Sequence, residues 1–176
     1  MKNIILTGFM ASGKTTIGKA LSEQLKMDFI DTDEMIEKEQ GMTINQIFAQ
    51  FGEEYFRNLE HKCAKKLSSC KKSVIATGGG FILNQENIKL LQKNGIVINL
   101  NTNEQIIRKR LENSKSTRPL LKDDFEKILL RFEKRKPLYD ICDIQINLDE
   151  ASTPSEHVNR IVKEYNNHLQ KGVINK

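Results

Sequence analysis

The chain has 176 residues, of which 38% are hydrophobic and 29% are charged, and this composition suits a single compact domain with a buried core. Its formal net charge of +5 comes from basic residues that are interleaved with acidic ones, which favours a small anionic substrate and argues against nucleic acid. The three cysteines have no C-x-x-C spacing, which argues against a disulfide framework and a zinc site. No long apolar run lies near the N-terminus, which argues against a signal peptide and a membrane span. Together these features predict a cytoplasmic protein.

A glycine-rich loop at residues 8–16, with the sequence GFMASGKTT, follows a short apolar strand predicted over residues 3–7. It matches the pattern G-x-x-x-x-G-K-[ST] and precedes apolar residues at helical spacing, which is the context that a phosphate-binding loop requires. Its glycines let backbone N–H groups approach a phosphate closely; an ordinary glycine turn is the alternative. Lys14 would bring positive charge to the β- and γ-phosphates, and the hydroxyl of Thr15 would bind the Mg²⁺ that bridges them. The residues expected to bind ATP here are Gly8, Ala11, Ser12, Gly13, Lys14, Thr15 and Thr16.

Two aspartates stand at the end of the second predicted strand, which covers residues 28–31. Ligands of open α/β sheets bind at the carboxyl ends of the strands, so we expect Asp31 and Asp33 on the same rim as the phosphate-binding loop. The alternative is that either aspartate only caps the helix that follows.

Gly52 separates two predicted helices, the first of which opens with a capping box at residues 43–46. The second helix carries Arg57 beside an apolar stripe, where the arginine is either functional or an ordinary solvated charge. A third strand, over residues 73–77, ends in three consecutive glycines at 78–80. Their N–H groups are suited to face an anion or a hydroxyl; a flexible loop is the alternative.

The fourth predicted strand covers residues 96–100, and Thr102 is expected to cap the helix that follows it. Apolar periodicity is lost over residues 112–124, a basic and polar segment. We expect this segment to be a mobile lid, because a kinase must keep water away from the γ-phosphoryl group.

The next predicted helix ends near Arg135, which either belongs to the site or only interacts favourably with the helix dipole. A fifth strand over residues 143–147 and a last helix with Pro154 in its first turn complete the chain. Five strands separated by helices predict an α/β fold in which a parallel sheet lies between two helical layers.

Taken in order, these motifs resemble those of the shikimate kinase family over nearly the whole chain. The likeness rests on GFMASGKTT at 8–16, DTD at 31–33, FRNLE at 56–60, TGGG at 77–80, RPLL at 118–121 and RKPLY at 135–139. The resemblance implies transfer of the γ-phosphate of ATP to the 3-hydroxyl of shikimate, on the route to chorismate and the aromatic amino acids. It also implies a sheet order of 2-3-1-4-5. We expect one kinase domain over residues 1–176, with a shikimate-binding segment at 33–60, that works as a monomer.

The resemblance also implies roles for individual residues in holding the acceptor. Asp33 would bind the hydroxyls of shikimate and orient the attacking one or accept its proton. Arg57 and Arg135 would hold the substrate carboxylate, and the backbone N–H groups of Gly79 and Gly80 would complete the pocket.

On the donor side, the resemblance implies that Asp31 holds the water shell of Mg²⁺. Arg118 would swing in from the lid and join Lys14 against the charge of the transferring phosphoryl group. Arg110 and Pro154 would pack on the adenine.

Ala11 departs from the family pattern, which usually has glycine at this position. An alanine at positive φ is strained, so we expect a negative φ at Ala11 and little effect of Ala11→Gly on ATP affinity. The rival assignments are a kinase of gluconate or of a nucleoside monophosphate, and a nucleotide-dependent switch without kinase activity. The acidic, glycine-rich and arginine motifs together favour a hydroxylated carboxylic acid as the acceptor.

Overall fold

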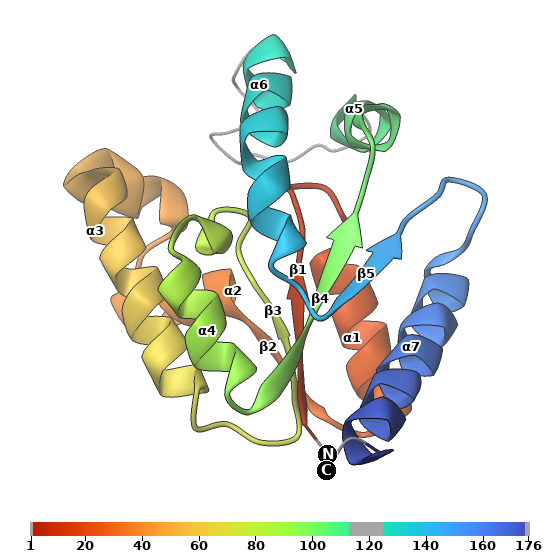
Figure 1. The fold of residues 1–176 in the computed structure, drawn as a ribbon. Helices are drawn as coiled ribbons and strands as arrows, with labels where there is room; N and C mark the ends of the chain where they lie inside the picture. The colour runs from red at the N-terminus through yellow and green to blue at the C-terminus, as the bar shows by residue number, and fades with distance from the viewer. Residues whose placement is uncertain (1, 113–124, 175–176) are drawn as a thin grey trace.

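The computed structural model describes residues 2–112 and 125–174, which form a three-layer α/β fold (Figure 1). Each of the first four strands is followed by helices that return the chain to the start of the next strand. The elements in chain order are β1 (Asn3–Thr7), α1 (Lys14–Leu25), β2 (Asp28–Asp31), α2 (Thr32–Gln40), α3 (Ile44–Leu67), β3 (Ser73–Ala76), η1 (Phe81–Leu83), α4 (Gln85–Gln92), β4 (Gly95–Asn101), α5 (Glu104–Glu112), α6 (Phe125–Arg135), η3 (Lys136–Asp140), β5 (Ile144–Asn147) and α7 (Pro154–Ile174).

The strands form one parallel sheet in the order β2-β3-β1-β4-β5, which confirms both the fold class and the strand order expected from the sequence. β1 lies at the centre, where Ile4 is in register with Val74 of β3 and with Ile96 of β4. Both faces of a parallel sheet are covered by its crossover helices, which explains why the central strands are short, uninterrupted apolar runs.

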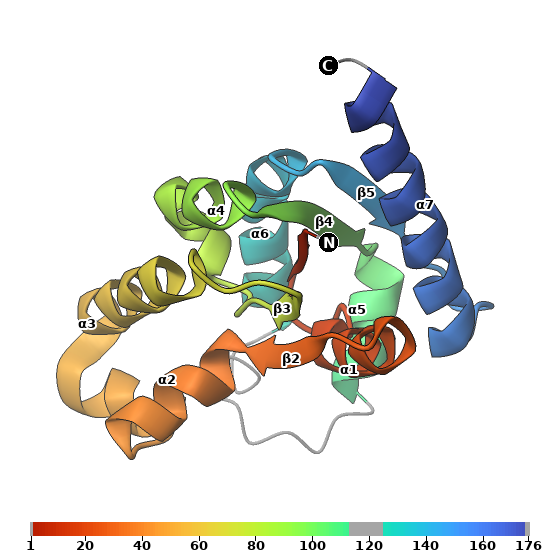
Figure 2. The same ribbon diagram turned by 90° about the horizontal axis from the view of Figure 1, so that it is seen from below.

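Two apolar cores lie on opposite faces of the sheet. Ile5 of β1 points into the core beneath α3, α4 and α6, whereas Ile4 and Leu6 point into the core beneath α1 and α7. The view along the sheet separates these two helical layers (Figure 2). Gly18 of α1 permits close packing, because a Cβ there would lie 2.6 Å from the ring of Phe29 on β2.

The predicted helix boundaries are largely confirmed. Thr43 and Gln46 form the expected capping box, and Gly52 interrupts the helical backbone of α3 with a φ of 80°. The prediction that Thr102 caps α5 is wrong. Asn103 takes that role, since its Oδ1 accepts from the backbone N–H of Ile106 at 2.9 Å.

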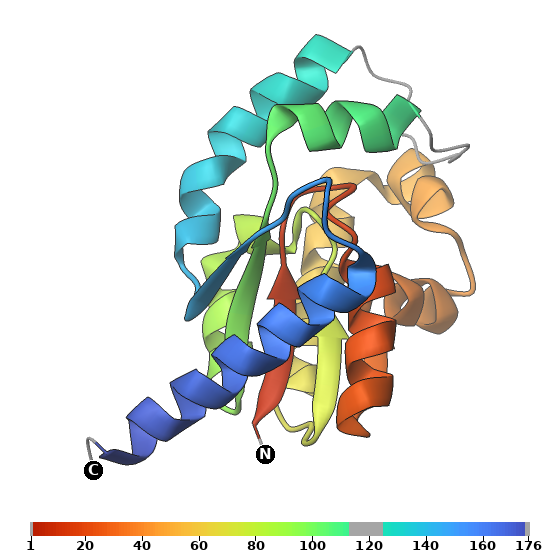
Figure 3. The same ribbon diagram turned by 90° about the vertical axis from the view of Figure 1, so that its right-hand side faces the viewer.

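All five strands point the same way, so their carboxyl ends form one edge of the sheet, and α5 and α6 stand above it (Figures 1 and 3). The expected lid at 112–124 lies outside the described residues except for Glu112, which is the last residue of α5. Across 2–112 and 125–174, no helix is long and apolar enough to cross a membrane.

Candidate active site

The phosphate-binding loop joins β1 to α1 at the centre of this edge, as the sequence predicts. Gly8 and Gly13 adopt positive φ angles of 146° and 88°, which glycine tolerates without strain. Lys14 is the first residue of α1, and its Nζ donates to the backbone oxygens of Gly8 at 2.7 Å and of Phe9 at 2.9 Å. It also lies 3.2 Å from Oγ of Ser12. The ammonium is therefore held by the loop itself, above the N-terminus of a helix.

Ala11 has a φ of 60°, so the expectation of a negative φ is wrong. The loop makes a tight turn here, in which the N–H of Ser12 donates to the oxygen of Phe9 at 3.2 Å. Arg110, on α5, donates from Nη1 to the oxygen of Ala11 at 2.9 Å. Burial lowers the pKa of Arg110, although this guanidinium stays charged at any ordinary pH. The positive φ of Ala11, which the local sequence disfavours, is thus accompanied by one contact from a distant part of the chain.

Thr15 and Asp31 lie side by side below the loop, where Oγ1 of Thr15 donates to Oδ2 of Asp31 at 2.8 Å. The other carboxylate oxygen of Asp31 accepts from the N–H of Asp33 at 3.0 Å and so caps α2. A hydroxyl and a carboxylate in contact are the oxygen ligands that Mg²⁺ uses beside substrate phosphates. Within the described ranges no group of three or more His, Cys, Asp or Glu could hold a metal ion by itself, and an Mg²⁺ bound through substrate phosphates needs no such group.

The three glycines after β3 lie against the charged residues that the sequence singled out. At Gly78 an added Cβ would collide with the carboxylate of Asp33. The N–H of Gly78 also donates to Oγ1 of Thr32 at 2.9 Å, which fixes the start of α2 against this loop. Gly79 faces the phosphate-binding loop, since a Cβ there would lie 3.4 Å from the nitrogen of Met10. Because these residues have no side chains, the segment that carries Asp33 and the phosphate-binding loop can approach each other closely.

Arg57 projects from α3 toward Gly80, where an added Cβ would collide with its guanidinium. Its Nη1 lies 2.7 Å from Oε2 of Glu60, and its Nη2 lies 2.7 Å from Oε1 of Glu53. Glu60 is only 1% exposed, and burial raises its pKa to about 7 although Arg57 acts in the opposite direction. Burial lowers the pKa of Arg57, but the two glutamates outweigh burial and the net shift is upward.

Arg135, the last residue of α6, reaches the same glycine loop from the opposite side. Its Nη1 donates to the backbone oxygen of Gly79 at 3.3 Å, and the hydroxyl of Tyr139 donates to the same oxygen at 2.9 Å. Burial lowers the pKa of Arg135 and raises that of Tyr139. The acidic Asp33 and the two arginines thus converge on the three consecutive glycines.

Some expected site residues are not part of this cluster. Thr16 is exposed on α1, and Pro154 is the exposed first residue of α7, where Thr153 and Glu156 form a capping box. The adenine contact of Pro154 stays a prediction. Arg118 lies outside the described residues.

Three contributors to the site were not assigned roles from the sequence. They are Thr32, which holds Gly78, Glu60, which pairs with Arg57, and Tyr139, which shares the oxygen of Gly79. The spacing of Arg57 and Glu60 was a usable signal, because residues three apart on a helix are neighbours. Thr32 and Tyr139 lie within the DTD and RKPLY motifs, but their partners are 46 and 60 residues away along the chain, so the motifs do not reveal their contacts.

Comparison with known proteins identifies the family. Residues 10–166 match the family described as "Shikimate kinase". The chain is 45% identical over 167 residues to a shikimate kinase of Thermodesulfovibrio yellowstonii, and the match covers 94% of this chain and 95% of that protein. It is 47% identical over 164 residues to a shikimate kinase of Caldicellulosiruptor bescii, with 92% and 94% covered. The chain belongs to the shikimate kinase family.

Solved structures of shikimate kinases share the whole fold. One from Acinetobacter baumannii in complex with shikimate gives a TM-score of 0.86 at 36% identity, covering 94% of this chain and 93% of that one. One from Bacteroides thetaiotaomicron gives 0.87 at 31% identity, covering 94% and 98%. A sugar kinase from a Janibacter species gives 0.55 at 16% identity, which shows a shared fold alone. Membership of the shikimate kinase family makes the protein an ATP-dependent kinase and excludes a switch without kinase activity.

Proposed function

We propose that this protein transfers the γ-phosphoryl group of ATP to the 3-hydroxyl of shikimate, giving shikimate 3-phosphate and ADP. The observation that supports this most directly is the convergence of Asp33, Arg57 and Arg135 on residues 78–80, beside the phosphate-binding loop. One carboxylate and two guanidinium groups suit a ligand with several hydroxyls and one carboxylate.

In this proposal Arg57 and Arg135 bind the carboxylate of shikimate, and the N–H groups of Gly79 and Gly80 complete the pocket. The burial that lowers the pKa of Arg135 also removes competing water, which strengthens its hydrogen bonds to an anion. A charge-assisted hydrogen bond contributes roughly 1.5–3 kcal/mol, so loss of either arginine should weaken productive binding about ten- to a hundredfold.

Asp33 positions the acceptor in the proposed reaction. An oxygen of shikimate attacks the γ-phosphorus, the bond from that phosphorus to the bridging oxygen of ADP breaks, and the proton of the hydroxyl leaves to Asp33 or to water. The transition state of such a transfer is loose, so alignment and charge neutralisation matter more than proton abstraction. We therefore assign more of the rate to Lys14 and Arg118 than to Asp33.

The donor half consists of the phosphate-binding loop, with Arg110 and Pro154 proposed at the adenine. Arg110 lies over the loop through its hydrogen bond to Ala11, which supports a position beside the nucleotide. Thr15 would bind Mg²⁺ directly and Asp31 through water, and their contact at 2.8 Å supports this pairing. When bound, Mg²⁺ neutralises charge on the β- and γ-phosphates.

We also propose that the enzyme works as a monomer in the cytoplasm. All three cysteines, Cys63, Cys70 and Cys142, are free thiols, which fits a reducing compartment that also supplies ATP. The dispersed positive charge offers no single basic tract for nucleic acid.

A coupled assay of ADP release tests the activity with shikimate, gluconate and nucleoside monophosphates as acceptors, each with ATP and Mg²⁺. We expect ADP release with shikimate only. Release with a nucleoside monophosphate and none with shikimate would overturn the proposal. The variant Asp33→Asn tests the acceptor side, and unchanged turnover of shikimate by this variant would contradict both roles given to Asp33.

A further inference from the structure

Three consecutive basic residues of α5 reach three different segments of the protein. They are Arg108, whose guanidinium carbon lies 4.0 Å from the centroid of the Phe125 ring on α6, Lys109, which is paired with Glu150 in the loop between β5 and α7, and Arg110, which is bonded to Ala11 in the phosphate-binding loop. The far half of α5 is thus joined to its surroundings on three sides.

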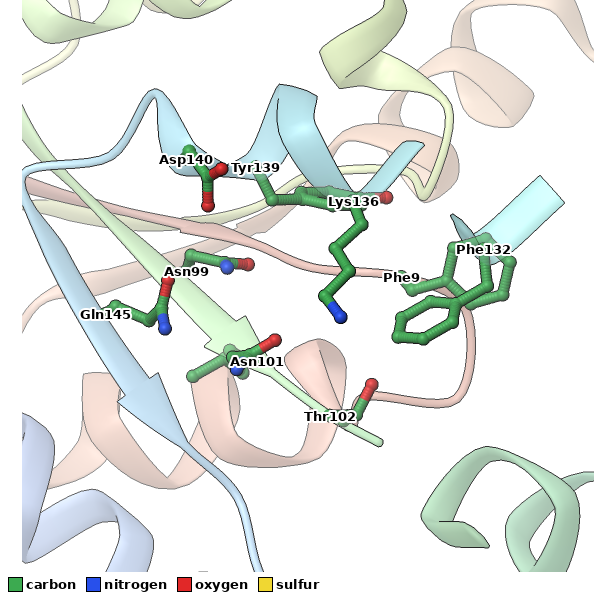
Figure 4. A pocket seen from close by; sticks show the side chains of 10 residues that line it. Phe9, Asn99, Asn101, Thr102, Phe132, Lys136, Tyr139, Asp140 and Gln145 are labelled. Atoms are coloured by element: carbon green, nitrogen blue, oxygen red, sulfur yellow. The ribbon is translucent and has the colours of Figure 1, made fainter. Parts of the chain in front are cut away.

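Packing against the cores fixes only the base of α5. Ile106 and Ile107 are buried in the two cores on opposite faces of the sheet, whereas the next two residues are exposed. Beside the base lies a polar cavity of about 60 Å³, whose lining includes Asn101 and Thr102 (Figure 4). The rest of the helix stands above the edge of the sheet (Figure 3). Its direction therefore depends on the contacts of its basic side chains.

The pair of Lys109 and Glu150 ties α5 to a loop that is itself braced. Nζ of Lys109 donates to Oε2 of Glu150 at 2.8 Å, across 41 residues of chain. Arg160 of α7 holds the loop, because its Nη1 donates to the backbone oxygen of Asn147 at 2.8 Å and its Nη2 lies 3.3 Å from Oδ2 of Asp149. The loop is therefore a fixed anchor for the movable helix.

Glu150 also faces Arg110. Burial lowers the pKa of Arg110, and the negative charge of Glu150 acts in the opposite direction. Arg110 lies over the entry to α1, because a Cβ added to Gly13 would come within 3.4 Å of its Nη1. One carboxylate thus holds the stretch of α5 that covers the phosphate-binding loop.

We propose that Glu150 is a positioning residue for nucleotide binding, since its ion pair with Lys109 holds α5 where Arg110 stays over the phosphate-binding loop. This rests on the place proposed above for Arg110 beside the nucleotide. The side chains of Lys109 and Glu150 are 64% and 44% exposed, so the pair stabilises the fold little. Its loss lowers the fraction of molecules that hold Arg110 in place, and the apparent affinity for the nucleotide falls by the same factor.

The affinity for ADP, measured by isothermal titration calorimetry without an acceptor, tests this proposal. Glu150→Gln and Lys109→Met should each weaken ADP binding about two- to fivefold. The two substitutions change the net charge in opposite directions, so a purely electrostatic effect on the anionic ADP would tighten binding in Glu150→Gln. Tighter binding in Glu150→Gln, or unchanged binding in either variant, would overturn the proposal.

Two further variants separate the ion pair from the change in charge. The exchange Lys109→Glu/Glu150→Lys should recover most of the affinity for ADP, and a loss equal to both single losses combined would contradict the pairing. The matched control is Glu23→Gln, which makes the same charge change as Glu150→Gln at the far end of α1 and should leave ADP binding unchanged. The exposed positions of these residues favour normal folding, which thermal unfolding checks.

Arg110→Met distinguishes this proposal from the role of Arg110 itself. In the Arg110→Met background, Glu150→Gln should have no further effect on ADP affinity, because no guanidinium remains to be positioned. A full further loss there would overturn the positioning role but leave Arg110 at the nucleotide. Unchanged ADP affinity in Arg110→Met alone would overturn both. Neither result depends on the acceptor, which the assay of ADP release with shikimate tests separately.

Discussion

Nη1 of Arg57 lies 2.7 Å from Oε2 of Glu60, a carboxylate that is almost completely withdrawn from water. Glu53 holds the other edge of the same guanidinium from the solvent side. Arg57 is therefore fixed in orientation by two acids on its own helix, one buried and one exposed, before any substrate arrives. In the role proposed for Arg57, this pre-orientation lowers the entropy lost when the guanidinium binds the substrate carboxylate.

Glu60→Gln should change how stability depends on pH. The pKa of Glu60 rises from 4.5 to about 7 in the folded protein, so between these values the folded state keeps a proton that the unfolded state has released. The free energy of unfolding of the wild type should therefore fall as the pH rises from 4.5 to 7, by about 3 kcal/mol from this residue. Urea titrations across this range check it, and the decrease should be smaller in Glu60→Gln.

Glu53→Gln is the matched control for this pH dependence, since it removes the other partner of Arg57. The pKa of Glu53 is lowered, chiefly by its hydrogen bond to Arg57, so its contribution is present above pH 4.5 and is lost as the pH falls. In Glu53→Gln, the free energy of unfolding should still fall between pH 4.5 and 7, as it does in the wild type. If both variants behave alike, Glu60 is not the group that retains the proton.

Arg57→Met should raise the KM for shikimate about ten- to a hundredfold, because a charge-assisted contact to the substrate carboxylate is lost. It should also leave the buried carboxylate of Glu60 without its ion-pair partner, which lowers stability. The double variant Arg57→Met/Glu60→Gln should recover stability without recovering the KM. Steady-state kinetics and thermal unfolding of both variants separate the two effects, and a recovered KM in the double variant would contradict a direct role of Arg57 in binding.

Gly80→Ala should raise the KM for shikimate about tenfold, because its new methyl group displaces the guanidinium of Arg57. Gly79→Ala is the paired variant, since a Cβ there meets the nitrogen of Met10 at 3.4 Å and needs only a small adjustment. Steady-state kinetics with varied shikimate at saturating ATP should show a much larger increase in the KM for shikimate in Gly80→Ala than in Gly79→Ala. The reverse order would show that Arg57 does not depend on the open space at Gly80.

Ala11→Gly should stabilise the protein by about 0.5–1 kcal/mol. Relief of about 1–2 kcal/mol of strain at positive φ exceeds the entropy that glycine adds to the unfolded chain. The control is Ala20→Gly within α1, which should destabilise by about 1 kcal/mol. Chemical denaturation measures both, and a loss of stability in Ala11→Gly would mean that the methyl group makes contacts worth more than the strain. We expect the KM for ATP to change little.

Much of the fold was predictable because strands and helices depend on local patterns. The apolar run of β1, the capping box at Thr43 and the break at Gly52 each follow from a few adjacent residues. The candidate site was predictable where a motif carries the chemistry, as at Lys14 and the three glycines. The strand order was predicted from the family likeness alone, because residue spacing does not determine it.

The misses come from contacts between distant parts of the chain. The φ of Ala11 accompanies a hydrogen bond from Arg110, 99 residues away, and no local propensity registers it. Thr102 and Asn103 are equally good caps by residue type, and only the position at which the chain leaves β4 decides between them. The pairing of Glu60 with Arg57 is local and follows from their spacing, but the spacing does not predict that Glu60 is only 1% exposed.

The backbone oxygen of Gly79 has one more donor than it needs. Arg135 and the hydroxyl of Tyr139 both bond to it, and burial raises the pKa of Tyr139, so that hydroxyl keeps its proton at physiological pH. In the proposed function, Arg135 can therefore release this oxygen and turn to the substrate carboxylate without leaving a buried carbonyl unpaired. The hydroxyl of Tyr139 keeps its hydrogen bond to the oxygen of Gly79, so this carbonyl stays paired when Arg135 moves away.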